Sequence, residues 1–175
     1  MVTPRGFRGW LRDAALPLLV ARLVVGGVYV WYGVNKVREP VAFLKALHGY
    51  GILPVEPPHP LNLTVVVLPW IEILCGALLL AGAWLRAAGV LLCAMTVVFT
   101  VAVALHASGL AAAQGLSLCA VRFDCGCGIG EVWVCPKLAE NLALIALAGV
   151  AAGSRSRRWT LEGLRTAAPS GSAGR

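Results

Sequence analysis

Four apolar stretches, separated by shorter polar segments, occupy most of the 175-residue chain. A helix needs about 20 apolar residues, at a rise of ~1.5 Å each, to cross the hydrocarbon core of a bilayer. The pattern predicts four membrane-spanning helices, at residues 14–34, 61–84, 87–106 and 136–153. The last of these is short and would cross the bilayer only with little tilt.

The connections between the spans differ in character. Residues 35–60 are rich in proline, and Pro40 suits the first turn of a short helix. Apolar residues that follow it at helical spacing predict a helix lying in the membrane interface, which the Gly49–Pro54 segment ends. Only two residues, Leu85 and Arg86, separate the second and third spans, so we expect these two helices to form an antiparallel hairpin.

Composition agrees with an integral membrane protein. The chain is 59% hydrophobic and 13% charged, with a mean hydropathy of +0.80, whereas soluble domains are about 25% charged. The net charge of +7 comes from arginines at the ends of spans and in the tail, with no interleaved aromatic residues. We therefore expect contact with a lipid bilayer and its headgroups, and no nucleic-acid partner.

The distribution of Lys and Arg predicts the orientation of the spans. Basic residues are more frequent on the side that holds both termini and Arg86 than on the side that holds residues 107–135. We expect a basic cytoplasmic N-terminus at residues 1–13, an uncleaved first helix and a basic, disordered cytoplasmic tail within residues 154–175. Residues 107–135 would then face outward from a bacterial inner membrane.

This outward segment carries four of the six cysteines, with the spacing C-x5-C-x-C-x7-C over Cys119, Cys125, Cys127 and Cys135. Cysteines in an oxidising compartment form disulfides, and four of them allow three pairings. A direct bridge between Cys125 and Cys127 would be strained, and strained disulfides are the ones that exchange readily.

Three interpretations of these cysteines remain open. They form two static disulfides that staple the loop, or a redox-active pair, Cys125 and Cys127, with Cys119 and Cys135 as resolving or structural cysteines. A four-cysteine metal site is disfavoured because zinc ligands usually come in pairs separated by two to four residues, so no metal is expected. Charge from Asp124 and Glu131 would raise the pKa of a nearby thiol, and charge from Arg122 would lower it.

Two ionisable residues, Arg22 and Glu72, fall inside predicted spans, where such residues are costly and usually functional. Counted from the cytoplasmic helix ends at ~1.5 Å per residue, Arg22 lies ~12 Å deep and Glu72 ~18 Å deep. A long Arg side chain closes this gap, so we predict an ion pair between the first and second helices. This pair either fixes helix packing or forms a proton or quinone headgroup site. Lys36, Glu140 and Asn141 lie near outer helix ends, where they pair across the bundle mouth and orient the loop, or are simply solvated.

Several short motifs occur together in a recognisable order. They are Leu19-Val-Ala-Arg22, Gly33-Val-Asn-Lys36, Gly49-Tyr-Gly-Ile-Leu-Pro54, Glu72-Ile-Leu-Cys-Gly76, Asp124-Cys125-Gly-Cys127 and Glu140-Asn141. Over residues 14–153 this order resembles the MauE/DoxX family, and more narrowly its MauE branch of methylamine-utilisation membrane proteins.

The resemblance implies a four-helix membrane protein that helps to mature the disulfide-rich small subunit of methylamine dehydrogenase beside a thioredoxin-like partner. It places the family's C-x-C on Cys125 and Cys127, and its intramembrane charges on Arg22 and Glu72. Two positions depart from the family pattern. Gly128 stands where an aromatic residue commonly follows the C-x-C, and Glu140-Asn141 stands where Arg-Asn often opens the fourth helix.

Together these features predict an all-α integral membrane four-helix bundle with a cysteine-rich extracytoplasmic loop. Its predicted function is thiol–disulfide exchange with a periplasmic thioredoxin-like protein and a client protein with disulfides. One alternative is a non-catalytic anchor or assembly factor with a stapled loop. Another is a quinone-linked membrane subunit. No cofactor is expected for the exchange function, and a quinone is the one alternative.

Overall fold

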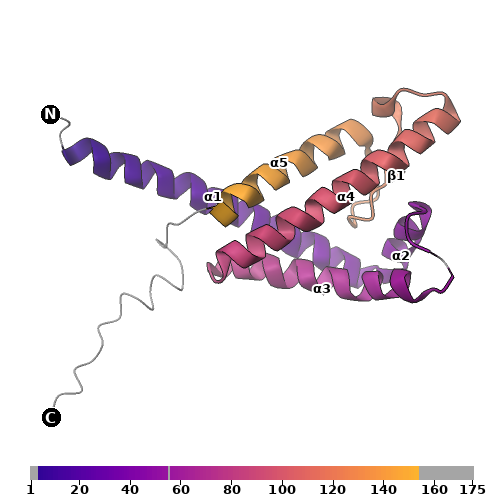
Figure 1. The fold of residues 1–175 in the computed structure, drawn as a ribbon, viewed down its shortest axis with the longest axis horizontal. Helices are drawn as coiled ribbons and strands as arrows, with labels where there is room; N and C mark the ends of the chain where they lie inside the picture. The colour runs from indigo at the N-terminus through magenta and orange to yellow at the C-terminus, as the bar shows by residue number, and fades with distance from the viewer. Residues whose placement is uncertain (1–3, 55, 154–175) are drawn as a thin grey trace, which may run out of the picture.

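The computed structural model describes residues 4–54 and 56–153, with side chains from residue 17 onward. The predicted tail at 154–175 lies outside the described residues. The described chain is mainly helical (Figure 1). The helices are α1 (Pro4–Arg38), α2 (Pro40–Gly49), α3 (His59–Ala81), α4 (Leu85–Gln114) and α5 (Val134–Gly153).

Four of these helices, α1, α3, α4 and α5, are long and apolar enough to cross a membrane. The predicted all-α membrane bundle is therefore confirmed, with Cys119, Cys125 and Cys127 in the loop between α4 and α5 and Cys135 in the first turn of α5. That loop also contains a short 3-10 helix, η1 (Leu118–Ala120), and a hairpin of two strands, β1 (Arg122–Asp124) and β2 (Glu131–Trp133). The sequence analysis predicted no strand.

The helix ends differ from the predicted ones. α1 begins at Pro4, before the predicted start at residue 14, and α4 continues to Gln114, past residue 106. The turn between α3 and α4 lies before Leu85, because Gly82 ends α3 in the left-handed conformation, with φ of 73°. The amide of Ala83 then bonds to the carbonyl of Leu78 at 2.9 Å, which caps the helix.

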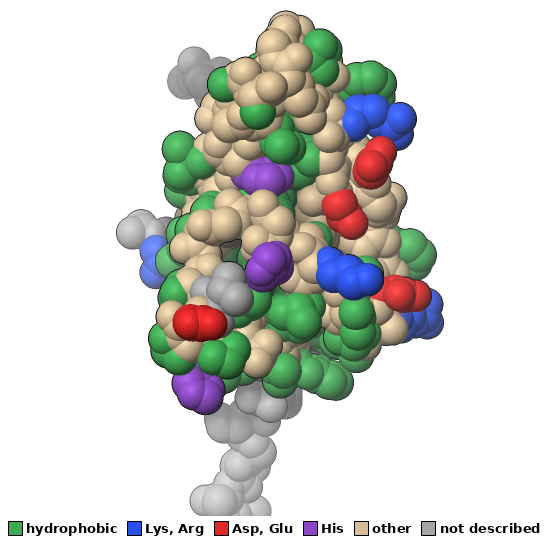
Figure 2. All heavy atoms as spheres, turned by 90° about the vertical axis from the view of Figure 1, so that its right-hand side faces the viewer, with side chains coloured by type: hydrophobic (Ala, Val, Ile, Leu, Met, Phe, Trp, Pro, Cys, Tyr) green, Lys and Arg blue, Asp and Glu red, His purple; other side chains and the backbone are tan. Residues whose placement is uncertain are grey.

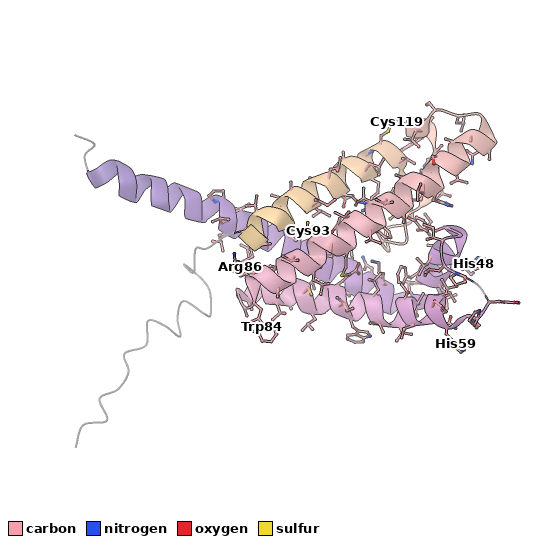
Figure 3. The ribbon with its side chains drawn as sticks, viewed as in Figure 1. His48, His59, Trp84, Arg86, Cys93 and Cys119 are labelled. Atoms are coloured by element: carbon pink, nitrogen blue, oxygen red, sulfur yellow. A yellow bond between two sulfur atoms is a disulfide. The ribbon has the colours of Figure 1, made fainter. Side chains whose placement is uncertain are left out.

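The two ends of the bundle carry different features. Trp84 and Arg86 lie at the α3–α4 turn, whereas Cys119 lies at the opposite end, which we call the loop end (Figure 3). α1 packs against α3 and α4 packs against α5, while α3 and α4 diverge from their turn toward α2 (Figure 1). Acidic and basic side chains gather over the loop end (Figure 2), as expected for the end that faces water.

Glycines bring α1 and α3 into close contact. A Cβ atom built on Gly26 would lie 2.8 Å from the carbonyl oxygen of Gly76, and one on Gly33 would lie 2.7 Å from that of Pro69. Small residues allow membrane helices to approach closely and gain packing energy. These two contacts fix the register of α1 against α3, and with it the level of every polar side chain between them.

Adjacent glycines in α1 provide a matched test of this packing. A Cβ on Gly27 would meet no atom within 4 Å, so Gly27→Ala should leave stability unchanged or raise it, because Ala favours helix. Gly26→Ala should destabilise the protein by about 1–3 kcal/mol, because it drives a methyl group into the α3 backbone. Thermal unfolding in detergent, followed by tryptophan fluorescence, distinguishes them. Equal melting temperatures would contradict the proposed contact.

Candidate functional site

The C-x-C sits at the tip of the β1–β2 hairpin. Phe123 pairs with Val132, and Asp124 pairs with Glu131, so residues 125–130 form the tip. The Asp124 carboxylate accepts a hydrogen bond from the amide of Gly126 at 2.9 Å, which tightens the first turn. Three tip glycines have φ between 68° and 79°, in the left-handed region that side chains disfavour. They are Gly126, Gly128 and Gly130.

The four loop cysteines fall into two classes. A disulfide joins Cys119 to Cys135, with a Cα–Cα distance of 5.0 Å, and closes the base of the loop. Cys125 and Cys127 are free thiols, and each is almost fully buried. The structure therefore does not contain the two-bridge staple in which both inner cysteines are bonded.

The two inner thiols differ in acidity. The amide of Cys127 lies 3.2 Å from the sulfur of Cys125 and donates to it. A hydrogen bond from the Cys127 thiol lowers the pKa of Cys125, and the positive charge of Lys137 adds to this, against the effect of burial. The same hydrogen bond, together with burial, raises the pKa of Cys127. Within the pair, the thiol of Cys125 is therefore the more acidic and the thiol of Cys127 the less acidic.

Contacts with α1, α2 and α4 hold the tip on the bundle. The Tyr50 hydroxyl donates to the carbonyl oxygen of Cys125 at 3.2 Å. The Tyr50 ring packs against His106, with centroids 4.8 Å apart, and edge-on against Phe123. A side chain at Gly128 would overlap Asn35 at the end of α1. The tip is therefore seated against the helices and does not project freely.

Beneath the tip lies a buried ion pair, in which the Nζ of Lys36 is 2.5 Å from the Oε1 of Glu72. Both residues are about 5% exposed or less. The Nζ also lies 5.1 Å from the ring centroid of Phe43 and 5.8 Å from that of Phe99. The ammonium group thus contacts side chains of α2, α3 and α4.

The predicted Arg22–Glu72 ion pair is wrong. The glycine contacts place residue 72 opposite residue 30 of α1, about 12 Å along the helix from Arg22 at ~1.5 Å per residue. Side chains in a helix lean toward its N-terminus. In an antiparallel pair, Lys36 therefore leans toward Glu72, whereas Arg22 leans away from it. Arg22 is 7% exposed within α1, and Glu72 remains as the acidic partner of Lys36.

A second buried lysine ties α5 to α1. Lys137 is 2% exposed, and its Nζ lies 3.2 Å from the Tyr32 hydroxyl and 3.1 Å from the Oε2 of Glu140. Tyr32 also donates to the other oxygen of Glu140. Lys36 and Glu140 therefore each have a different partner, and they do not pair with one another across the bundle mouth.

The two lysines border a cavity of about 460 Å³ below the tip. Its polar lining includes Lys36, Glu72, Cys127, Lys137 and Asn141. The Nδ2 of Asn141 and the Oε2 of Glu72 are buried with no hydrogen-bond partner among the described residues. Within the side chains described from residue 17 to 153, no three His, Cys, Asp or Glu groups are placed to hold a metal ion.

Sequence analysis missed the roles of Tyr29, Tyr32, Tyr50 and Lys137. A signal for the first two is present, because Arg22, Val25, Tyr29, Tyr32 and Lys36 alternate in steps of three and four and are all buried. Lys137 could have been found as an ionisable residue at the start of an apolar span. The hydrogen bond from Tyr50 to the tip depends on the loop fold, which no local pattern reveals.

The fold and the site define a polytopic membrane protein that holds a buried dithiol at one end of a four-helix bundle. The sequence profile of the family described as "Methylamine utilisation protein MauE" matches residues 14–154. The chain therefore belongs to the MauE family. Comparisons with curated proteins and with solved structures give no match.

The acidity of the inner thiols can be titrated. In the reduced protein we expect Cys125 to ionise below the ordinary pKa of a thiol and Cys127 above it, because Cys127 donates a hydrogen bond to the Cys125 sulfur. Ultraviolet thiolate absorbance, taken as the difference from Cys125→Ser, measures the first titration. Cys127→Ala removes the hydrogen bond and should raise the Cys125 midpoint. An unchanged midpoint would mean that the hydrogen bond does not set it.

The buried ion pair can be tested by stability. Lys36→Met leaves the Glu72 carboxylate buried without its partner and should cost on the order of 3 kcal/mol. Replacing both residues, as Lys36→Met with Glu72→Met, should recover most of this loss. Lys45→Met, which removes an exposed lysine of α2, is the control. Thermal unfolding provides the measurement, and equal effects at Lys36 and Lys45 would contradict the pair.

Proposed function

We propose that this protein is a thiol–disulfide exchange component of the bacterial inner membrane. In this proposal, Cys125 and Cys127 pass a disulfide to a periplasmic thioredoxin-like partner, and through it to a client protein with disulfides. The observation that carries the proposal is the pair of adjacent free thiols with opposite pKa shifts on a glycine-rich tip. Static staples need no such difference in acidity.

The proposed orientation places the loop end in the periplasm and both termini in the cytoplasm. It is supported by the excess of basic residues predicted for the side of the termini. It is also supported by the positions of Arg86 and Cys119 at opposite ends of the bundle (Figure 3). A periplasmic loop meets an oxidising environment, in which the Cys119–Cys135 disulfide persists.

The exchange proceeds through a mixed disulfide. In the oxidised loop, a thiolate of the partner attacks the sulfur of Cys125, the Cys125–Cys127 bond breaks, and Cys127 takes the electron pair and a proton. The second thiolate of the partner then attacks the partner sulfur that is bonded to Cys125, and Cys125 leaves as a thiolate. The partner loses two electrons and the loop gains them. The lowered pKa makes Cys125 a good leaving group.

Burial of the thiols requires the tip to move during exchange. Cys125 and Cys127 are 0% and 2% exposed, so a protein partner reaches them only when the tip lifts from α1 and α2. The tip glycines permit such a change in backbone conformation. A second cavity, of about 280 Å³, is lined by tip residues together with Asn35 and Phe43.

Family membership points to the client. The family is described by methylamine utilisation, and the resemblance implies the disulfide-rich small subunit of methylamine dehydrogenase as the protein that is matured. Gly128 and Glu140 depart from the family pattern near the thiols. These departures bear on the identity of the client more than on the thiol chemistry.

Trapping the mixed disulfide tests the exchange. The test uses a thioredoxin whose second cysteine is replaced by serine and whose first cysteine is joined to thionitrobenzoate by a disulfide. The Cys125 thiolate of reduced Cys127→Ser protein attacks this disulfide and displaces thionitrobenzoate. The covalent complex through Cys125 should accumulate, because neither protein keeps a neighbouring thiol to resolve it, and non-reducing electrophoresis and peptide mass detect it. Cys125→Ser should give at least about tenfold less complex, because the remaining thiol, Cys127, is buried and burial raises its pKa.

Cys93→Ala, which removes a cysteine inside α4, is the matched control and should behave as the wild type. The oxidised wild type should also convert about one thioredoxin dithiol per chain to the disulfide. A wild type that oxidises no thioredoxin, with all variants folded, would favour the anchor with a stapled loop.

A further inference from the structure

We infer that the 460 Å³ cavity below the cysteine tip binds the headgroup of a membrane quinone, which reoxidises Cys125 and Cys127. This inference rests on the proposed exchange function, since it supplies the oxidant that a repeated exchange cycle needs. It also moves the candidate quinone site from the Arg22–Glu72 pair to a different set of residues.

The cavity has the size and lining of a small-molecule site. Such sites commonly measure about 300–1,000 Å³, are mostly apolar and carry a few fixed polar groups. Here the apolar lining includes Phe99, Ala102 and Leu144, and the polar groups come from α1, α3, α4, α5 and the cysteine tip. The Tyr29 hydroxyl, also in the lining, is bonded to Thr96.

Two unpaired polar atoms in the cavity match the two forms of a quinone. The Nδ2 of Asn141 is a donor that suits a quinone carbonyl oxygen, and the Oε2 of Glu72 is an acceptor that suits a quinol hydroxyl. Asn141 is 2% exposed and Glu72 is 5% exposed. Buried polar groups without partners are costly, so a ligand that satisfies both is favoured.

The cavity opens sideways between α3 and α4. Val98 lines it and is nevertheless 71% exposed, and Ala94, one turn earlier on α4, is also exposed. Leu68 lines the facing side on α3 and is partly exposed. α3 and α4 diverge from their turn toward α2 (Figure 1). Because both helices are candidate spans, the mouth faces lipid, which is the route of a hydrophobic ligand with an isoprenoid tail.

The thiols are placed so that the two reactions use different sulfurs. Cys127 lines the cavity and Cys125 does not, although the Cys125 sulfur lies 3.2 Å from the Cys127 amide. In the reoxidation step, the Cys125 thiolate and the Cys127 thiol lose two electrons and form the Cys125–Cys127 bond. The quinone gains these two electrons, the Cys127 proton and one proton from water, and leaves as the quinol.

Binding is tested without the thiols, in Cys125→Ser/Cys127→Ser protein in lipid nanodiscs. Decylubiquinone should quench tryptophan fluorescence saturably. Asn141→Leu should weaken binding about tenfold or more, through loss of a buried hydrogen bond. Ala102→Phe fills the cavity and should abolish binding. Val101→Phe, at the neighbouring lipid-facing position of 53% exposure, is its matched control and should bind as the parent does.

Electron transfer is tested in the protein with both thiols. Reduced protein should yield about one decylubiquinol per chain, detected by its absorbance change. Ala102→Phe should yield none, while its oxidised form still converts thioredoxin dithiol to the disulfide. Absence of saturable binding, or equal binding by Asn141→Leu, Ala102→Phe and the parent, would overturn the quinone site. The thioredoxin experiment reports on exchange alone. Its result therefore tests the proposed function independently of the quinone site.

Discussion

The ion pair between Lys36 and Glu72 is the interaction on which the rest of the site depends. A charge inside a bundle that crosses a membrane is costly unless it has a partner. Here the pair lies where α1, α2, α3 and α4 meet, and the Lys36 ammonium group also faces the rings of Phe43 and Phe99. The contacts that stabilise the buried Lys36 ammonium group therefore hold four helices in register below the cysteine tip.

The same pair defines the floor of the cavity. Lys36 occupies one carboxylate oxygen of Glu72 and leaves the other without a partner, and Asn141 likewise leaves a donor unpaired. Lys137, fixed by Tyr32 and Glu140, adds a second positive charge below the thiols. Both polar clusters thus serve the packing of the helices and also set the electrostatic environment of Cys125 and Cys127.

Sequence reasoning succeeded where the signal is local and failed where it depends on register. Apolar runs predict the four long helices, and the spacing of Cys125 and Cys127 singles out the tip. The acidic partner of Lys36 could not be derived, because depth counted from predicted helix ends ignores the glycine contacts that set how α1 meets α3. The lean of side chains toward the helix N-terminus then decides in favour of Lys36 over Arg22.

The difference between the two pairs of cysteines follows from their positions. Cys119 and Cys135 lie at the base of the loop, beside η1 and the start of α5, where a disulfide constrains the segment without involving the tip. Cys125 and Cys127 lie among glycines that tolerate a change of conformation. In the proposed cycle, Cys125 exchanges with a partner in water, and Cys127 faces an oxidant in the membrane. A C-x-C turn across the end of a bundle is a short route between the two, because only one residue separates the cysteine that exchanges with the partner from the cysteine that lines the cavity.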